Sequence, residues 1–114
     1  MLVVHAPRGY ARLLADMPRG VRRAASGVGP FDVVHVFVRR AAALRGAIRD
    51  ARRVMRREGM VWLSWPKRTS GVATDVDENA VRHAGLSLDL VDVKICAVDE
   101  TWSALKFVIP LKLR

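Results

Sequence analysis

A group of charged and polar side chains follows the hydrophobic run at residues 60–65 and could hold an anion. Lys67 and Arg68 come directly after Pro66, and ammonium and guanidinium groups are the usual partners of phosphate and carboxylate. Trp102 stands in a second turn, between two further apolar runs, and its indole could stack on a ring. The candidate ligand-binding rim consists of Arg8, Lys67, Arg68, Thr69, Ser70, Asp99, Glu100 and Trp102.

The same rim also has an interpretation without a ligand. Lys67 or Arg68 would then pair with an acid of the second turn, Asp99 or Glu100, and hold two loops together. Exposed ion pairs contribute only ~0–1 kcal/mol, so stability alone is a weak reason for these residues. Both interpretations stay open, and the ligand that the first one implies is a small anion.

Arginine is concentrated in the first half of the chain. The formal net charge is +9; residues 1–58 hold 13 arginines and four acids, whereas residues 59–114 hold seven basic and seven acidic residues. A basic face can bind nucleic acid without reading its sequence. A solvated surface explains the same residues, and we favour this second interpretation. The weak candidates for nucleic-acid contact are Arg45, Arg49, Arg52, Arg53 and Arg56.

Two histidines and the single cysteine raise the question of a metal. His5 and His35 lie on predicted neighbouring strands, but Cys96 lies on a strand two or more positions away. We therefore interpret both histidines as core residues bonded to the backbone, and predict no metal site. No arrangement of serine, cysteine and histidine resembles a nucleophilic triad, so no catalytic residue is assigned.

The elements that must position these residues follow from hydrophobic periodicity. The run at 60–65 is apolar on both sides, which is typical of a strand buried in a parallel sheet. Gly59 is expected to end the helix before it and Gly85 the helix after it. That second helix begins with a capping box at Asp75–Glu78 or, equally well, with Asp77 as its cap. Strands are predicted at 1–6, 21–26, 31–38, 60–65, 90–98 and 104–110, and helices at 10–17, 39–58 and 77–85.

Strands that alternate with helices predict an α/β fold of three layers, with a mostly parallel sheet of about six strands. The last two strands would form an antiparallel hairpin. In such a sheet ligands bind beyond the carboxyl ends of the strands. The loops at that edge are Pro7–Gly9, Arg39–Arg40, Pro66–Asp75 and Asp99–Ser103.

This order of elements resembles the second half of a class I methyltransferase, a Rossmann-like fold that ends in a β-hairpin. The segments GMVWLSWPKRTSGVATD and LVDVKICAVDETWSALKFVI, with the strand FDVVHVFV, resemble a bacterial domain-of-unknown-function family, number 3052. That family has no established activity to carry over to this chain. The methyltransferase resemblance implies S-adenosylmethionine as a cofactor.

The sequence departs from the methyltransferase pattern at the cofactor site. The turn after the first strand, His5–Tyr10, has one glycine where methyltransferases are glycine-rich, and Pro7 removes a backbone donor. The segment Arg22–Ser26 lacks the acid expected for the ribose hydroxyls, and the second helix and third strand are missing. We therefore predict a reduced, non-catalytic binding or interaction module with no cofactor. The alternatives are an S-adenosylmethionine-dependent methyltransferase and a nucleic-acid binder.

Composition sets the remaining expectations. The 114 residues suffice for a single domain, 1–114, in which 51% of residues are hydrophobic. No apolar run reaches the ~20 residues of a membrane helix, and the N-terminus does not resemble a signal peptide. A cytoplasmic bacterial protein is expected. Because one predicted helix must cover a sheet face rich in bulky side chains, a homodimer is expected too.

Overall fold

One mixed β-sheet forms the centre of the computed structural model, which describes residues 2–7, 30–98 and 100–114. Its strands are β1 (Leu2–Val4), β2 (Phe31–Phe37), β3 (Met55–Pro66), β4 (Val91–Ala97) and β5 (Trp102–Val108). The helices are α2 (Ala41–Val54) and α3 (Glu78–Leu86), with short 3₁₀ turns at Arg68–Ser70 and Leu111–Leu113.

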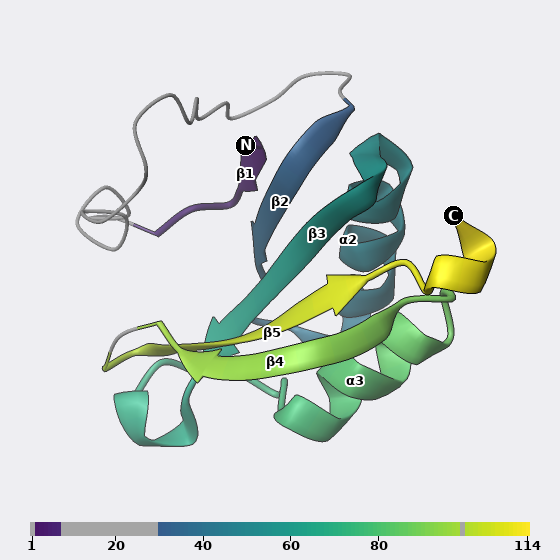
Figure 1. Ribbon diagram of the computed structural model, residues 1–114. Coiled ribbons are helices and arrows are strands. Elements are labelled where there is room, and N and C mark those ends of the chain that lie inside the picture. The colour runs from purple at the N-terminus through teal and green to yellow at the C-terminus, as the bar shows by residue number, and fades with distance from the viewer. Residues whose placement is uncertain (1, 8–29, 99) are drawn as a thin grey trace.

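The strand order in the sheet is β1-β2-β3-β5-β4 (Figure 1). β1, β2 and β3 are parallel, and β5 lies antiparallel between β3 and β4. The predicted α/β class and the terminal hairpin are therefore confirmed. The expected mostly parallel sheet of about six strands is corrected, because the described sheet has five strands and is mixed, with two parallel and two antiparallel strand pairs. The strand predicted at 21–26 lies outside the described residues.

Both described helices pack on the same face of the sheet (Figure 1). Their apolar stripes meet side chains from alternate positions of the strands, because successive strand residues point to opposite faces. The helix predicted at 10–17 lies outside the described residues. The centre of the core consists of Val34, Val36, Ile48, Val61, Leu63, Val81, Leu90, Leu105 and Phe107, all at most 1% exposed.

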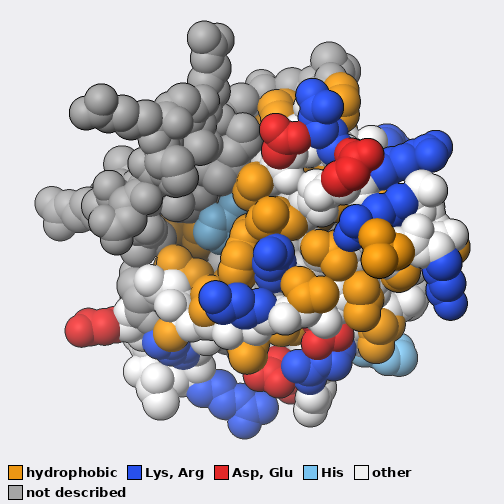
Figure 2. All heavy atoms as spheres, in the orientation of Figure 1, with side chains coloured by type: hydrophobic (Ala, Val, Ile, Leu, Met, Phe, Trp, Pro, Cys, Tyr) orange, Lys and Arg blue, Asp and Glu red, His pale blue; other side chains and the backbone are white. Residues whose placement is uncertain are grey.

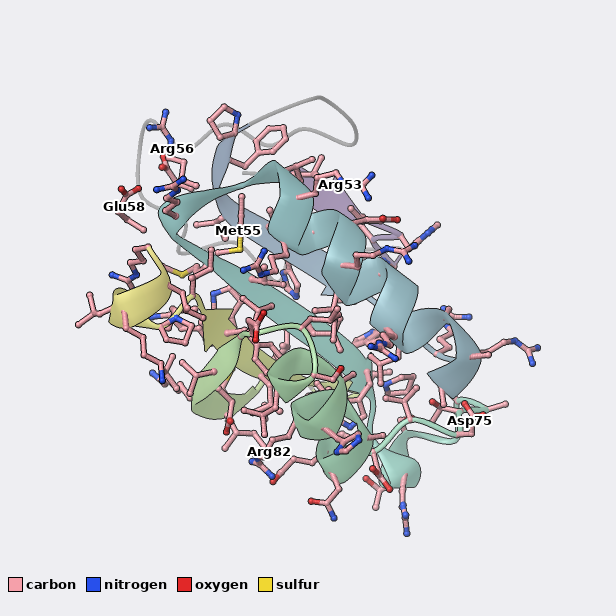
Figure 3. The ribbon with its side chains drawn as sticks, turned by 90° about the vertical axis from the view of Figure 1, so that its right-hand side faces the viewer. Arg53, Met55, Arg56, Glu58, Asp75 and Arg82 are labelled. Carbon is pink, nitrogen blue, oxygen red and sulfur yellow. The ribbon has the colours of Figure 1, made fainter. Side chains whose placement is uncertain are left out.

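The boundary between α2 and β3 differs from the prediction. The helix ends at Val54 instead of Glu58, and Met55 already pairs with Phe31 of β2. The register then jumps, so that Met60 pairs with Val33. Met55 is buried whereas Arg56 and Glu58 point outward (Figure 3). Burial of Met55 in the core therefore determines where the helix ends.

The sequence suggested that Gly59 ends a helix, and this prediction is wrong. Gly59 lies within β3, where it permits a close backbone approach. A Cβ atom at this position would lie 2.7 Å from the carbonyl oxygen of Asp32. The extra residues between Met55 and Met60 carry Arg56 out of α2, and its guanidinium pairs with Asp32 at 2.9 Å. Arg56 is therefore not part of the arginine face of the helix.

Two acids cap the two helices. Asp77 is the N-cap of α3, and its carboxylate accepts a hydrogen bond from the amide of Ala80 at 2.8 Å. This confirms the second of the two predicted capping registers. Asp75 instead accepts a hydrogen bond from the amide of Ala41 at 2.6 Å, at the start of α2 (Figure 3). The loop before α3 is thereby tied to the first turn of α2.

No helix within the described ranges is long and apolar enough to cross a membrane.

Candidate functional site

A cleft lies where the parallel strands β1 and β2 end. His5, Ala6 and Pro7 follow β1, while Val38, Arg39 and Arg40 connect β2 to the start of α2. The carboxyl ends of parallel strands meet at one sheet edge, where open α/β folds bind ligands. The cleft has a volume of about 730 Å³, and its lining is formed by His5, Ala6, Pro7, Phe37, Val38, Arg39, Arg40, Ala43, Gly46, Ala47, Asp50 and Trp102.

Two guanidinium groups and an indole give this cleft its chemistry. Arg39 and Arg40 are exposed, and the guanidinium carbon of Arg39 lies 5.7 Å from the centroid of the Trp102 ring. Trp102 is only 4% exposed and meets Phe37 edge to face, at a centroid distance of 4.9 Å. Asp50 is the acid of the described lining. The cleft thus combines an apolar floor with an excess of positive charge.

The same two arginines border a second hollow of about 500 Å³, whose other lining residues are Val72, Ala73, Thr74 and Asp75. The hydroxyl of Thr74 donates a hydrogen bond to the carbonyl oxygen of Arg39 at 2.6 Å. With the Asp75 cap on Ala41, this bond fixes the backbone from which Arg39 and Arg40 project. We take the larger cleft as the site because it lies at the carboxyl ends of both β1 and β2.

The predicted rim residues divide between two places. Trp102 lines the cleft, whereas residues 67–70 form a turn of their own and are not among the described lining residues. There the amide of Lys67 donates a hydrogen bond to the carbonyl oxygen of Thr101 at 2.7 Å, so turn and hairpin are held together by backbone. Arg68 lies 3.8 Å from Asp77, and both side chains are well exposed. Glu100 is exposed too, and Arg8 and Asp99 lie outside the described residues.

Sequence reasoning did not select Arg39 and Arg40 as site residues. The signal was their position directly after the strand at 31–38, at the edge where ligands bind.

The sequence suggested that both histidines lie in the core, and this prediction is wrong for His5. His5 follows β1, is exposed and has a positive φ of 57°. His35 is buried, but its Nε2 bonds to the hydroxyl of Ser64 at 2.7 Å, and its ring stacks on Phe37. Burial lowers the pKa of His35 from 6.5 to about 4. No group of three His, Cys, Asp or Glu among the described residues could hold a metal.

Comparison with solved structures places this architecture. The chain is similar to a 1,6-didemethyltoxoflavin methyltransferase from Burkholderia thailandensis with bound S-adenosylhomocysteine; the TM-score is 0.56, the identity is 13%, and the match covers 93% of this chain and 59% of that one. A Pyrococcus horikoshii protein gives a TM-score of 0.54 at 10% identity, and the match covers 96% of this chain and 71% of that one. A ribosomal protein methylase from Lactobacillus delbrueckii subsp. bulgaricus gives 0.51 at 15% identity, with 84% and 40% covered.

These similarities show the class I methyltransferase-like fold. At such identities they carry the fold alone, and the chain spans only 40% and 59% of the two methyltransferases. No family model matches the sequence, and no curated protein is similar to it in sequence. Membership of the family numbered 3052 therefore stays a prediction.

The fold implies S-adenosylmethionine, whose carboxylate suits the guanidinium groups at the described cleft but whose positive charge does not. The sulfonium of this cofactor is positive, and two guanidinium groups at the cleft disfavour a cation. Pro7 has no backbone N–H to offer a ligand after β1. The segment at 22–26, where the acid for the ribose is expected, lies outside the described residues.

Proposed function

We propose that this protein is a non-catalytic binding module on a class I methyltransferase-like scaffold, and that its cleft takes a small molecule combining an anionic group with an aromatic ring. The observation that carries the proposal is the position of Arg39, Arg40 and Trp102 around one cleft of about 730 Å³. A pocket of this size suits a small molecule.

Charge and shape support this ligand class. A guanidinium binds phosphate or carboxylate through two parallel hydrogen bonds. The apolar part of the lining, from Phe37 to Ala47, can bury a ring while the anion stays at the arginines. The second candidate, an S-adenosylmethionine-dependent methyltransferase, rests on the fold, and the same experiment separates it from the first.

Calorimetry with four probes tests the proposal. We expect adenosine 5′-monophosphate to bind more tightly than adenosine, because only the former carries an anion for the arginines. We expect Arg39→Gln/Arg40→Gln to weaken the monophosphate roughly tenfold or more while leaving adenosine unchanged, since a charge-assisted hydrogen bond contributes about 1.5–3 kcal/mol. The control Arg57→Gln/Lys112→Gln removes the same charge from exposed positions outside the cleft lining.

The remaining probes are S-adenosylmethionine and S-adenosylhomocysteine. Tight binding of either one, with no preference for the monophosphate, together with transfer of its methyl group to an acceptor, would reject the binding-module proposal in favour of the methyltransferase. An equal loss of affinity for the monophosphate in the cleft variant and in the control variant would show that binding depends on the overall charge of the protein and not on the cleft.

We further propose that the protein is a cytoplasmic homodimer that associates through the sheet face opposite α2 and α3. Trp62 and Lys106 are paired in register between β3 and β5, and both are partly exposed. Figure 2 shows apolar side chains in the middle of this face with basic side chains among them. Exposed apolar side chains gathered on one face favour an interface.

Light scattering measures the oligomeric state. We expect twice the monomer mass of 12.7 kDa at micromolar concentration, and the monomer mass for Trp62→Glu, which places a charge in the proposed interface. Leu111→Glu is the control, because Leu111 is 80% exposed in the C-terminal 3₁₀ turn. A wild-type monomer would contradict the proposal.

A further inference from the structure

A smaller groove lies between the second half of α2 and the turn after α3. Its volume is about 310 Å³, and it is lined by Arg49, Arg52, Arg53, Ser87, Leu88 and Asp89. Arg52 and Arg53 stand three and four residues after Arg49 along the helix, so both lie on the same flank of α2 as Arg49. The groove therefore brings three guanidinium groups to one small volume.

The charge of this groove is poorly balanced by the protein itself. The Nε of Arg52 is buried and has no hydrogen-bond partner among the described residues. Arg49 has Asp50 at 3.8 Å, but both side chains are more than 60% exposed, so that solvent screens the pair. Asp89 is the acid of the described lining. A buried N–H without a partner costs about 1–3 kcal/mol.

The opposite wall is preformed. The turn after α3 is closed by hydrogen bonds from the amides of Leu88 and Leu90 to the carbonyl oxygen of Gly85, both at 3.0 Å. Leu90 is 1% exposed, which anchors the turn in the core. Asp89 adopts a positive φ of 61° between them. The groove therefore has one wall of arginines and one rigid wall. Because the rigid wall is already ordered, a ligand would have to order only the arginine side chains.

We propose that this groove binds the phosphate group of a small, soluble molecule such as a phosphate monoester or a diphosphate. Guanidinium groups match the geometry of phosphate oxygens, and a volume of about 310 Å³ accommodates one or two phosphates. This site is separate from the cleft at Arg39 and Arg40 and does not depend on it.

A nucleic-acid backbone is a poorer match for the same surface. Proteins that bind duplex DNA commonly neutralise several phosphates along an extended path, often six to ten. Here the described lining offers three arginines within one short groove of about 310 Å³. Arg56, which would have lengthened the path, belongs to β3 and pairs with Asp32.

The test measures pyrophosphate binding by calorimetry, with Arg49→Gln/Arg53→Gln as the groove variant. Both side chains are exposed, so the variant is expected to fold. We expect at least tenfold weaker binding for this variant, and unchanged binding for a control that removes the same charge from exposed positions outside the groove, Arg57→Gln/Lys112→Gln.

Three results would overturn the proposal. The first is the absence of pyrophosphate binding to the wild-type protein at millimolar concentration. The second is an equal loss in the groove variant and in the Arg57→Gln/Lys112→Gln control. The third is a gel shift of duplex DNA that the groove variant abolishes while pyrophosphate does not bind, which would assign the arginines to a nucleic-acid surface.

Discussion

Replacement of Gly85 by alanine is expected to lower the free energy of unfolding by about 1–3 kcal/mol, as overpacking of a core does. A Cβ at this position of α3 would lie 2.2 Å from Cε1 and 2.6 Å from Cζ of Phe107. The ring of Phe107 is completely buried and cannot move aside without displacing its neighbours. Alanine otherwise favours a helix over glycine by about 1 kcal/mol, so the sign of the effect tests the packing.

Denaturant unfolding of four proteins separates the clash from other effects. Phe107→Leu alone removes ring atoms and is expected to be destabilising, because it leaves a cavity. The double variant Gly85→Ala/Phe107→Leu is expected to be more stable than the sum of the single effects predicts, since the methyl group fills space that the ring vacates. A Gly85→Ala protein more stable than the wild type would show that α3 does not pack as closely on β5 as described.

Gly85 also illustrates what the sequence could not reveal. The sequence suggested that this glycine ends the helix, but α3 continues to Leu86 and the glycine faces β5. Gly59 was misinterpreted in the same way, because both glycines are required by backbone or ring atoms distant in sequence. Local patterns located the strands and helices well, since hydrophobic periodicity is a local property. Close approaches between elements are non-local and leave no comparable signal.

The candidate site likewise has features that local sequence patterns predicted and features that depend on contacts distant in sequence. The sequence placed the loops at 39–40, 66–75 and 99–103 at one edge of the sheet, and Trp102 does line the cleft there. It could not decide which cations border that cleft. Lys67 and Arg68 belong to a turn held to the hairpin by backbone, whereas Arg39 and Arg40 project at the cleft because Thr74 and Asp75 fix the start of α2. Those contacts join residues 34 and 35 positions apart.

Acidification from pH 6.5 to pH 4 is expected to destabilise the protein by about 3 kcal/mol through His35 alone. Burial lowers the pKa of His35 in the folded protein to about 4, from 6.5. Between these values the unfolded chain binds a proton that the folded chain excludes, so stability falls as the pH falls. The contribution is fully present above pH 6.5 and is lost progressively down to about pH 4, and each pKa unit corresponds to 1.36 kcal/mol.

The reason for this effect is the place of His35 in the sheet. It is 8% exposed, its Nε2 bonds to Ser64, and Ser64 is completely buried beside it on β3. The variant His35→Gln keeps an amide that can bond to the Ser64 hydroxyl but carries no proton in this range. Its unfolding free energy is therefore expected to depend less on pH than that of the wild type between pH 6.5 and 4, although it is less stable at pH 7 because the ring packing on Phe37 is lost.

Chemical denaturation at half-unit pH intervals gives the slope of the unfolding free energy against pH for the wild type and for His35→Gln. The titration of the carboxylates is common to both proteins and cancels in the difference between the two slopes. His83→Gln is the matched control, because it makes the same substitution at a histidine that is exposed on α3. Parallel curves for the wild type and His35→Gln would show that His35 is protonated in the folded protein as readily as in the unfolded chain. The imidazole would then have to be open to solvent or paired with a carboxylate, contrary to its buried contact with Ser64.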